Sequence, residues 1–294
     1  MAESTVVLTY GPSGVGKTTD QGYSFPTALF VAAPGALHSI QSVCGYEPAT
    51  TQANTLQQAT RVLKEVKGKF PVLVIDDFSF LAEQTFATLE RSHTGFKLWG
   101  ALRDAVLNFR DAARFADMHV VLNAWEQAPK TNYKGERIRG GPRLSGNMPE
   151  QVPALCDVVL REAHDARRQP WPAVYRCHLD PSWVMKDRLN VASLVDPAPM
   201  NVAELLRAAN IEVERHPQLP DQEQYVTAIA AAFAAEGGAT PDLANSYYAE
   251  LVGSGMAVSV ARWTLRDAMD RSEIRKALAA ARSTFIDTNQ TALL

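Results

Sequence analysis

The chain has 294 residues, enough for one large α/β domain or for a core domain plus a smaller appendage. Of these residues 46% are hydrophobic and 21% are charged, a composition typical of an ordinary soluble globular protein. Its formal net charge is -3, which argues against a protein that coats DNA through its overall field and leaves only a local basic patch for nucleic acid. The cysteines Cys44, Cys156 and Cys177 lack C-x-x-C spacing and predict neither disulfides nor a zinc site. Without a leader-like start or a membrane-length apolar run, the chain is expected in the cytoplasm, with no membrane contact.

The first predicted element is a strand, Thr5–Tyr10 (TVVLTY), which runs directly into a glycine-rich loop. Further apolar runs of strand length follow at Ala28–Ala32, Val72–Ile75, His119–Leu122 and Asp157–Leu160. Runs that do not alternate with polar residues favour strands covered on both faces, as in a parallel sheet.

Helical patterns lie between these strands. Thr55–Glu65 opens with Thr55 and Gln58 at capping-box spacing. In Leu98–Ala116 one face is apolar, formed by Leu98, Leu102, Ala105, Val106, Phe109 and Ala113. Strands that alternate with helices predict a doubly wound α/β core.

The glycine-rich loop matches the phosphate-binding pattern G-x-x-x-x-G-K-[ST] at every position, between a strand and a predicted helix. Its residues are Gly11, Pro12, Ser13, Gly14, Val15, Gly16, Lys17 and Thr18, and Thr19 follows as a further nucleotide contact. Successive backbone N–H groups are expected to face one phosphate. Lys17 is expected to reach the β- and γ-phosphates, and Thr18 to offer its hydroxyl to Mg2+. The plainer alternative is a glycine-rich turn without a ligand.

Three polar residues at strand ends are candidates for catalysis. Asp76 follows the strand Val72–Ile75 and is expected to hold Mg2+ through water. Asp77 either orients or deprotonates the attacking water or is a helix cap. Asn123 ends the strand His119–Leu122 and is either a γ-phosphate sensor or a turn residue.

The segment from Ala124 to Gly146 is long, glycine-bearing and almost free of aliphatic residues. Its five cations stand against Glu126 and Glu136, a local charge of +3. The candidate DNA-binding residues are these cations and two interleaved aromatic rings: Trp125, Lys130, Tyr133, Lys134, Arg137, Arg139 and Arg143. Cations neutralise phosphates while rings stack on unpaired bases, which favours single-stranded nucleic acid. A solvated surface loop is the alternative.

Beyond Pro170-Trp171-Pro172, the segments Val174–Leu179 and Trp183–Leu189 predict a hairpin-like pair of strands. Lys186 and Arg188, two positions apart on a strand, point the same way. They are either arginine-finger-like groups for a γ-phosphate bound by a neighbouring subunit or a solvated strand end.

After Pro197-Ala198-Pro199 the composition shifts towards alanine, and a domain boundary is expected near residue 200. Residues 1–199 would form the P-loop core and residues 200–294 a helical C-terminal domain for partner binding, DNA binding or packing. The predicted helices are Val226–Glu236, Asp242–Val252, which Thr240 caps, and Ser272–Ile286. The glycine-bearing turn before Ala257–Met269, a segment with Arg262, Trp263 and Arg266, favours either a helix-turn-helix or a packed bundle.

The order of these features resembles the phage-encoded, core-only RecA-like P-loop ATPases, which are AAA-type nucleotide-binding proteins associated with single-strand annealing and homologous recombination. The stretch Gly141–Gly146 (GPRLSG), leading to Cys156-Asp157-Val158-Val159, is similar to that family as well, and the resemblance covers roughly residues 5 to 190.

This resemblance implies a single-stranded-DNA-dependent ATPase that uses ATP and Mg2+ and self-associates into a ring or filament in the cytoplasm of a phage host. By the same likeness, the loop after Asn123 corresponds to a DNA-binding loop, and Lys186 and Arg188 to fingers between subunits. A single-strand-binding protein is a further expected partner.

One departure concerns the water-activating glutamate that RecA-like ATPases usually carry near the end of the second strand. The sequence there reads Ala32-Ala33-Pro34-Gly35-Ala36, so either Asp77 substitutes for it or hydrolysis is slow. A nucleotide-switched adaptor, such as a helicase loader, is compatible with this departure. A nucleotide kinase, with the segment from Ala124 to Gly146 as its lid, is a third class of function.

Overall fold

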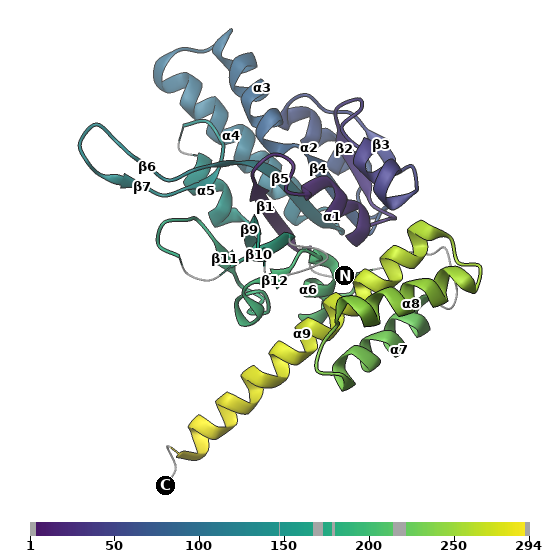
Figure 1. The fold of residues 1–294 in the computed structure, drawn as a ribbon. Helices are drawn as coiled ribbons and strands as arrows, with labels where there is room; N and C mark the ends of the chain where they lie inside the picture. The colour runs from purple at the N-terminus through teal and green to yellow at the C-terminus, as the bar shows by residue number, and fades with distance from the viewer. Residues whose placement is uncertain (1–3, 147, 167–172, 178–179, 214–221, 292–294) are drawn as a thin grey trace.

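The computed structural model describes residues 4–146, 148–166, 173–177, 180–213 and 222–291, with the side chains of 150 and 283–291 left out (Figure 1). Within these residues a ten-stranded sheet forms the centre, and its main strands run in the order β12-β10-β9-β1-β5-β4-β2-β3. The strands are β1 (Val6–Gly11), β2 (Leu29–Ala32), β3 (Ala49–Thr51), β4 (Val72–Asp76), β5 (His119–Gln127), β8 (Gly141–Pro142), β9 (Val158–His164), β10 (Ala173–Arg176), β11 (Lys186–Asp187) and β12 (Ala198–Pro199).

The strands from β9 to β3 are parallel, whereas β8, β10, β11 and β12 pair antiparallel. Because β5 lies between β1 and β4, the strand that enters the glycine-rich loop and the strand that ends in Asp76 are next-nearest neighbours. All the apolar runs predicted as strands form strands of this sheet. The mostly parallel sheet confirms the predicted α/β core.

Helices cover both faces of the sheet. One face carries α2 (Leu56–Glu65), α3 (Phe78–Glu90), α4 (Gly95–Arg114) and α5 (Met148–Leu155). The other carries α1 (Lys17–Ser24), a π-helical turn η1 (Ile40–Cys44), a 3-10 turn η2 (Ser193–Val195), α6 (Val202–Ala208) and part of α9 (Val258–Thr291). The apolar face predicted for Leu98–Ala116 is the buried face of α4. Thr55 caps α2, where its side chain accepts from the backbone N–H of Gln58.

The predicted hairpin of Val174–Leu179 and Trp183–Leu189 is wrong. Among their described residues the two segments do not pair with each other: β10 pairs with Arg161–His164 of β9, and β11 pairs with Val158–Val159 of the same strand. β9 has seven residues, so its outer edge is long enough for both short strands in succession. Residues 178 and 179 lie outside the described residues.

The C-terminal helices are α7 (Gln222–Ala235), α8 (Pro241–Gly253) and α9, and they pack around an apolar cluster of their own. Thr240 caps α8 by accepting from the backbone N–H of Leu243, as predicted. The predicted helix Ser272–Ile286 is only part of α9, which begins at Val258 and projects away from the body of the molecule (Figure 1). No helix among the described residues is both long and apolar enough to cross a bilayer.

Candidate functional site

The glycine-rich loop adopts backbone conformations that side chains disfavour. Gly14 has a φ of 79° and Gly16 a φ of 113°, both in the region that glycine tolerates. At Gly11 the limit is space, because a Cβ there would lie 2.7 Å from the Cβ of Glu162. The loop therefore needs glycine at all three positions, which explains the motif and argues against an incidental turn.

The loop borders a cavity of about 520 Å³, a size typical of small-ligand sites. The cavity lies at the carboxyl ends of the parallel strands, where ligands bind in open α/β sheets. Its walls come from the loop, from the chain after β2, from the end of β4 and from β5. The lining residues are Ser13, Gly14, Gly16, Lys17, Thr18, Thr19, Ala33, Ala36, Ser39, Asp76, Asp77, Phe80 and Trp125.

Lys17 begins α1, so its charge lies where the positive end of the helix meets the cavity. The Lys17 ammonium donates to the backbone carbonyls of Gly11 at 3.0 Å and Pro12 at 2.9 Å. These bonds hold the ammonium against the loop. Together with the backbone N–H groups of the loop, it makes a cradle suited to a phosphate chain.

Thr18 and Asp76 form a pair of oxygen donors on the cavity wall. The Thr18 hydroxyl donates to the Asp76 carboxylate at 2.6 Å. Burial raises the pKa of Asp76, while its bonds to Thr18 and Asn123 favour the charged form. One carboxylate and one hydroxyl suit Mg2+, which keeps several waters and takes its other ligands from substrate phosphates. The described residues contain no cluster of His, Cys, Asp and Glu that would hold a metal alone.

Asn123 lies beneath the cavity and is fully buried. Its side-chain oxygen accepts from the Thr9 hydroxyl at 2.7 Å, and its amide donates to Asp76 at 3.4 Å. Asn123 therefore orients Asp76, and it does not line the cavity. Its role as a γ-phosphate sensor stays a prediction.

Asp77 both caps a helix and lines the cavity. Its carboxylate caps α3 by accepting from the backbone N–H of Phe80 at 2.9 Å, and its side chain also lines the cavity. Burial raises the pKa of Asp77 to about 6. A carboxyl group with that pKa is ionised near neutral pH and basic enough to accept a proton.

The chain after β2 lines the cavity without a carboxylate. Ala33, Ala36 and Ser39 are its cavity-lining residues. The departure from the RecA-like pattern is therefore present in the folded site, and Asp77 is the carboxylate that lines the cavity beside Asp76.

Glu162, on β9, was not a candidate from the sequence. It is fully buried beside Gly11, where the Thr9 side chain and Lys17 favour its charged form. Burial raises its pKa to about 8 against the opposing effect of Lys17. The sequence signal was available: a strand extended from Asp157–Leu160 to His164 would place Glu162 on the same face as the buried Val158 and Leu160.

The basic segment forms a hairpin rather than an irregular loop. β6 (Lys130–Thr131) pairs with β7 (Arg137–Ile138) around a turn in which the Asn132 side chain accepts from the backbone N–H groups of Lys134 and Glu136. The hairpin projects from the body at the end of β5 (Figure 1). Its candidate DNA-binding residues are all exposed: Lys130, Tyr133, Lys134, Arg137 and Arg139. Lys130, Arg137 and Arg139 also line a hollow of about 400 Å³.

The remaining two candidates of this segment lie closer to the cavity. Trp125 is half-buried and lines the nucleotide-sized cavity. Arg143 lies over the Trp125 ring at 5.3 Å and forms an ion pair with Glu83 at 3.2 Å. Both residues therefore connect the cavity wall to the base of the hairpin.

Lys186 and Arg188 lie near the start of β9, away from the cavity. The Lys186 ammonium donates to backbone carbonyls at the end of α5, with 2.5 Å to Cys156 and 3.0 Å to Ala154. Arg188 is exposed and lies 3.6 Å from Asp157. The structure does not bring them to the cavity of their own chain, and contact with a neighbouring subunit stays a prediction.

Two of the three side chains that suggested a DNA-reading helix are buried. Trp263 and Arg266 pack inside the molecule, whereas Arg262 is exposed. This arrangement corresponds to the packed bundle that was the alternative to a helix-turn-helix.

A protein-family model described as an AAA domain matches residues 3–189 of the chain. No curated protein matches it. Among solved structures, a KaiC-like protein from the hyperthermophilic archaeon Pyrococcus horikoshii OT3 is similar at 17% identity, with 59% of this chain and 78% of that chain covered and a TM-score of 0.37. A RadB recombinase is similar at 18% identity, with 63% and 86% covered and a TM-score of 0.37.

Proposed function

The chain belongs to the AAA-domain family of P-loop proteins, and from that premise we propose that it binds ATP with Mg2+ and hydrolyses it in response to single-stranded DNA. The observation that supports this proposal most directly is the course of β5. One strand holds Asn123 beneath the cavity, places Trp125 on the cavity wall, and then leads into the exposed basic hairpin.

In this proposal the loop and four side chains of the cavity carry the chemistry. The loop and Lys17 bind the triphosphate, Thr18 and Asp76 hold Mg2+, and Asp77 orients or deprotonates the attacking water. Mg2+ would neutralise charge between the β- and γ-phosphates.

The hairpin would bind the DNA. Its cations neutralise backbone phosphates, and the ring of Tyr133, which is 93% exposed and has the Lys134 ammonium 5.7 Å from its centroid, would stack on an unpaired base. Such binding is sequence-tolerant, which fits single-strand annealing or strand exchange in a phage recombination system. The protein would act as an oligomer, ring or filament, in which Lys186 and Arg188 face a neighbouring subunit.

A second function is favoured by a specific observation: no carboxylate from the chain after β2 lines the cavity. If Asp77 acts only as a cap, hydrolysis is slow and the protein is a nucleotide-switched adaptor, such as a helicase loader. DNA or partner binding would then follow ATP occupancy rather than turnover.

The test measures the affinity for a fluorescent single-stranded oligonucleotide by anisotropy, with and without ATP and Mg2+. The wild type is expected to bind more tightly with ATP. Lys17→Ala should lose ATP binding by more than about thirtyfold, because the phosphates lose a partly buried charged partner, and its DNA affinity should no longer respond to ATP. A monomer that ignores DNA and transfers phosphate to a nucleoside monophosphate would replace the proposal with the kinase.

A further inference from the structure

The short helix that carries Lys17 and Thr18 is held by a helix from the far end of the chain. In α1, one turn after Lys17, the Asp20 carboxylate accepts from the Arg266 guanidinium of α9 at 3.0 Å and from the Tyr175 hydroxyl at 2.5 Å. Asp20 is 1% exposed and Arg266 is 7% exposed. This contact is therefore a buried ion pair that joins the nucleotide loop to the C-terminal helix.

The same arginine makes three other contacts, one of them an ion pair with Asp270, one turn further along α9, at 3.6 Å. Its guanidinium also donates to the backbone carbonyl of Met200 and lies over the ring of Tyr23, on α1, at 4.5 Å. The Tyr23 ring in turn meets Trp263 of α9 edge-on, with 5.7 Å between ring centroids. Two side chains of α1, Asp20 and Tyr23, are thus held by one turn of α9.

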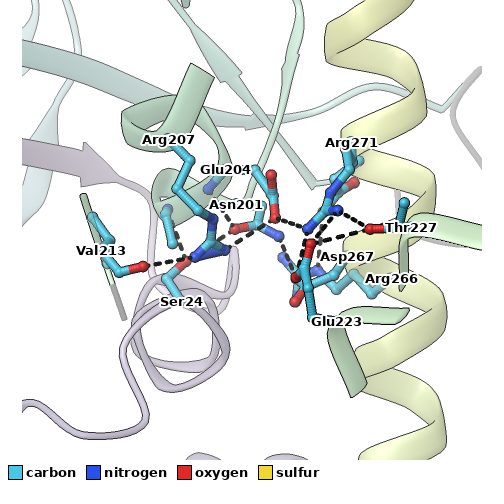
Figure 2. A network of polar contacts seen from close by, with 12 residues as sticks. Ser24, Asn201, Glu204, Arg207, Val213, Glu223, Thr227, Arg266, Asp267 and Arg271 are labelled. Carbon is cyan, nitrogen blue, oxygen red and sulfur yellow. Dashed lines mark hydrogen bonds and ion pairs between the residues drawn. The ribbon is translucent and has the colours of Figure 1, made fainter. Parts of the chain in front are cut away.

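A second route joins the end of α1 to α9, and Figure 2 shows most of it. Ser24, the last residue of α1, donates to the side chain of Asn201 at 3.4 Å. Asn201 donates onward to Asp267 of α9 at 2.8 Å. The buried side of α1 therefore contacts α9 in two ways, directly through Asp20 and indirectly through Asn201, the residue that precedes α6.

These contacts act on a short helix that carries the phosphate-binding residues. α1 has eight residues, or about two turns, so a displacement at Asp20 moves Lys17 and Thr18 with it. α1 also packs closely on η1, because a Cβ at Gly22 would lie 2.8 Å from Ile40.

We propose that Arg266 is a positioning residue for the nucleotide. By holding Asp20, it fixes the position of α1 and therefore of Lys17 and Thr18. Nucleotide binding in turn stabilises the packing of α9 against α1. The coupling is reciprocal by thermodynamic linkage. It makes α9, whose second half projects from the body, an element whose docking depends on ATP. The inference rests on nucleotide binding by the loop and not on the proposed action on DNA.

A matched control lies on the same helix. Arg271 is 5% exposed, and it pairs with Glu223 of α7 at 2.8 Å and with Glu204 of α6 at 3.6 Å (Figure 2). Loss of Arg271 therefore loosens α9 without removing a contact to α1. Arg266→Gln and Arg271→Gln both remove a buried guanidinium, but only Arg266→Gln should weaken nucleotide binding.

The experiment titrates the full chain with mant-ATP and Mg2+ in the absence of DNA and records the melting temperature of each variant. Arg266→Gln is expected to raise the Kd for mant-ATP by roughly tenfold, within the usual range of coupling between linked sites. Arg271→Gln should lower the melting temperature as well but leave the Kd within about twofold of the wild type. Arg266→Lys keeps a charge beside Asp20 and should recover most of the affinity.

Hydrogen exchange in the wild type measures the reciprocal effect without any variant. ATP with Mg2+ should slow exchange of backbone amides in residues 258–270 and leave those of α2, on the other face of the sheet, unchanged. The proposal is overturned if Arg266→Gln binds mant-ATP like the wild type, or if Arg271→Gln raises the Kd as much. Exchange in α9 that is indifferent to ATP would also overturn it. None of these outcomes depends on DNA.

Discussion

The two alternatives for Asp77 are separable because its cap and its cavity contact need different chemistry. Asparagine still accepts a bond from the N–H of Phe80, so Asp77→Asn keeps the cap of α3. It removes the proton acceptor, and the turnover number should fall by about 10²- to 10⁴-fold if Asp77 acts on water. The melting temperature reports the cap separately.

Asp77→Ala serves as the counterpart, since it should lose both the turnover and about 1 kcal/mol of stability from the cap. In the wild type, turnover should decline as the pH falls through about 6, where Asp77 takes up its proton. If Asp77→Asn turns over ATP normally, Asp77 is a cap alone and the adaptor function gains support.

Glu162 gives a prediction about stability. Its pKa of about 8 in the folded protein exceeds the ordinary value of 4.5, so folding favours the protonated form. The stability that this group contributes is fully present below pH 4.5 and is lost as the pH rises through about 8. Glu162→Gln does not titrate. We therefore compare the melting temperature of the variant with that of the wild type at each pH. This difference should be more positive at pH 8 than at pH 5, by on the order of 2 to 4 °C.

The measurement is a pair of thermal melts for wild type and variant at both pH values. A difference in melting temperature that does not change with pH would mean that Glu162 is ionised in the folded protein. Glu162 also shows what pattern reading misses. Alternation along the strand predicts that Glu162 faces inward, but only the pairing of β9 beside β1 reveals that it lies against Gly11.

At the scale of elements, the hairpin of β6 and β7 is where DNA binding is tested. Changing Arg137 and Arg139 to Ala removes two exposed cations, and the slope of log K against log salt for single-stranded DNA should become shallower by about 1.4. Nucleotide affinity should stay nearly intact, because neither side chain lines the cavity. The measurement is a salt series of oligonucleotide anisotropy titrations.

The control replaces two exposed cations on α2, Arg61 and Lys64, with Ala, which changes the net charge equally. If both double variants weaken DNA binding to the same extent, the effect is one of overall charge and the hairpin is not the binding element.

The elements show which sequence signals were sufficient. Continuous apolar runs predicted the parallel strands, and the 3.6-residue period of α4 predicted its buried face, because both patterns follow from burial alone. The pairing of β10 and β11 with β9 was not predictable, since two short segments on one edge look like a hairpin in sequence. The hairpin of β6 and β7 depends on a local turn around Asn132 within a polar segment, where periodicity gives no signal.

At the scale of the whole molecule, two elements link the cavity to distant parts of the chain. β5 leads from the cavity to the hairpin, and α1 leads from it to α9 through Asp20 and Arg266. Residues 200–294 were expected to form a separate helical domain, and α6 and α9 contribute to the same apolar cluster as the face of the sheet that carries α1. Of the C-terminal helices, α6 and α9 therefore pack against the same face of the sheet as α1, while α7 and α8 pack around a separate cluster with α9.

The central claim is that single-stranded DNA bound to the hairpin increases ATP turnover in the cavity, because β5 joins the two sites. The most direct test is steady-state ATP turnover as single-stranded DNA is added, with the mass of the protein measured under the same conditions. The account predicts that DNA stimulates turnover and that the assembly is larger than a dimer. A monomer whose turnover is unchanged at saturating single-stranded DNA would contradict it.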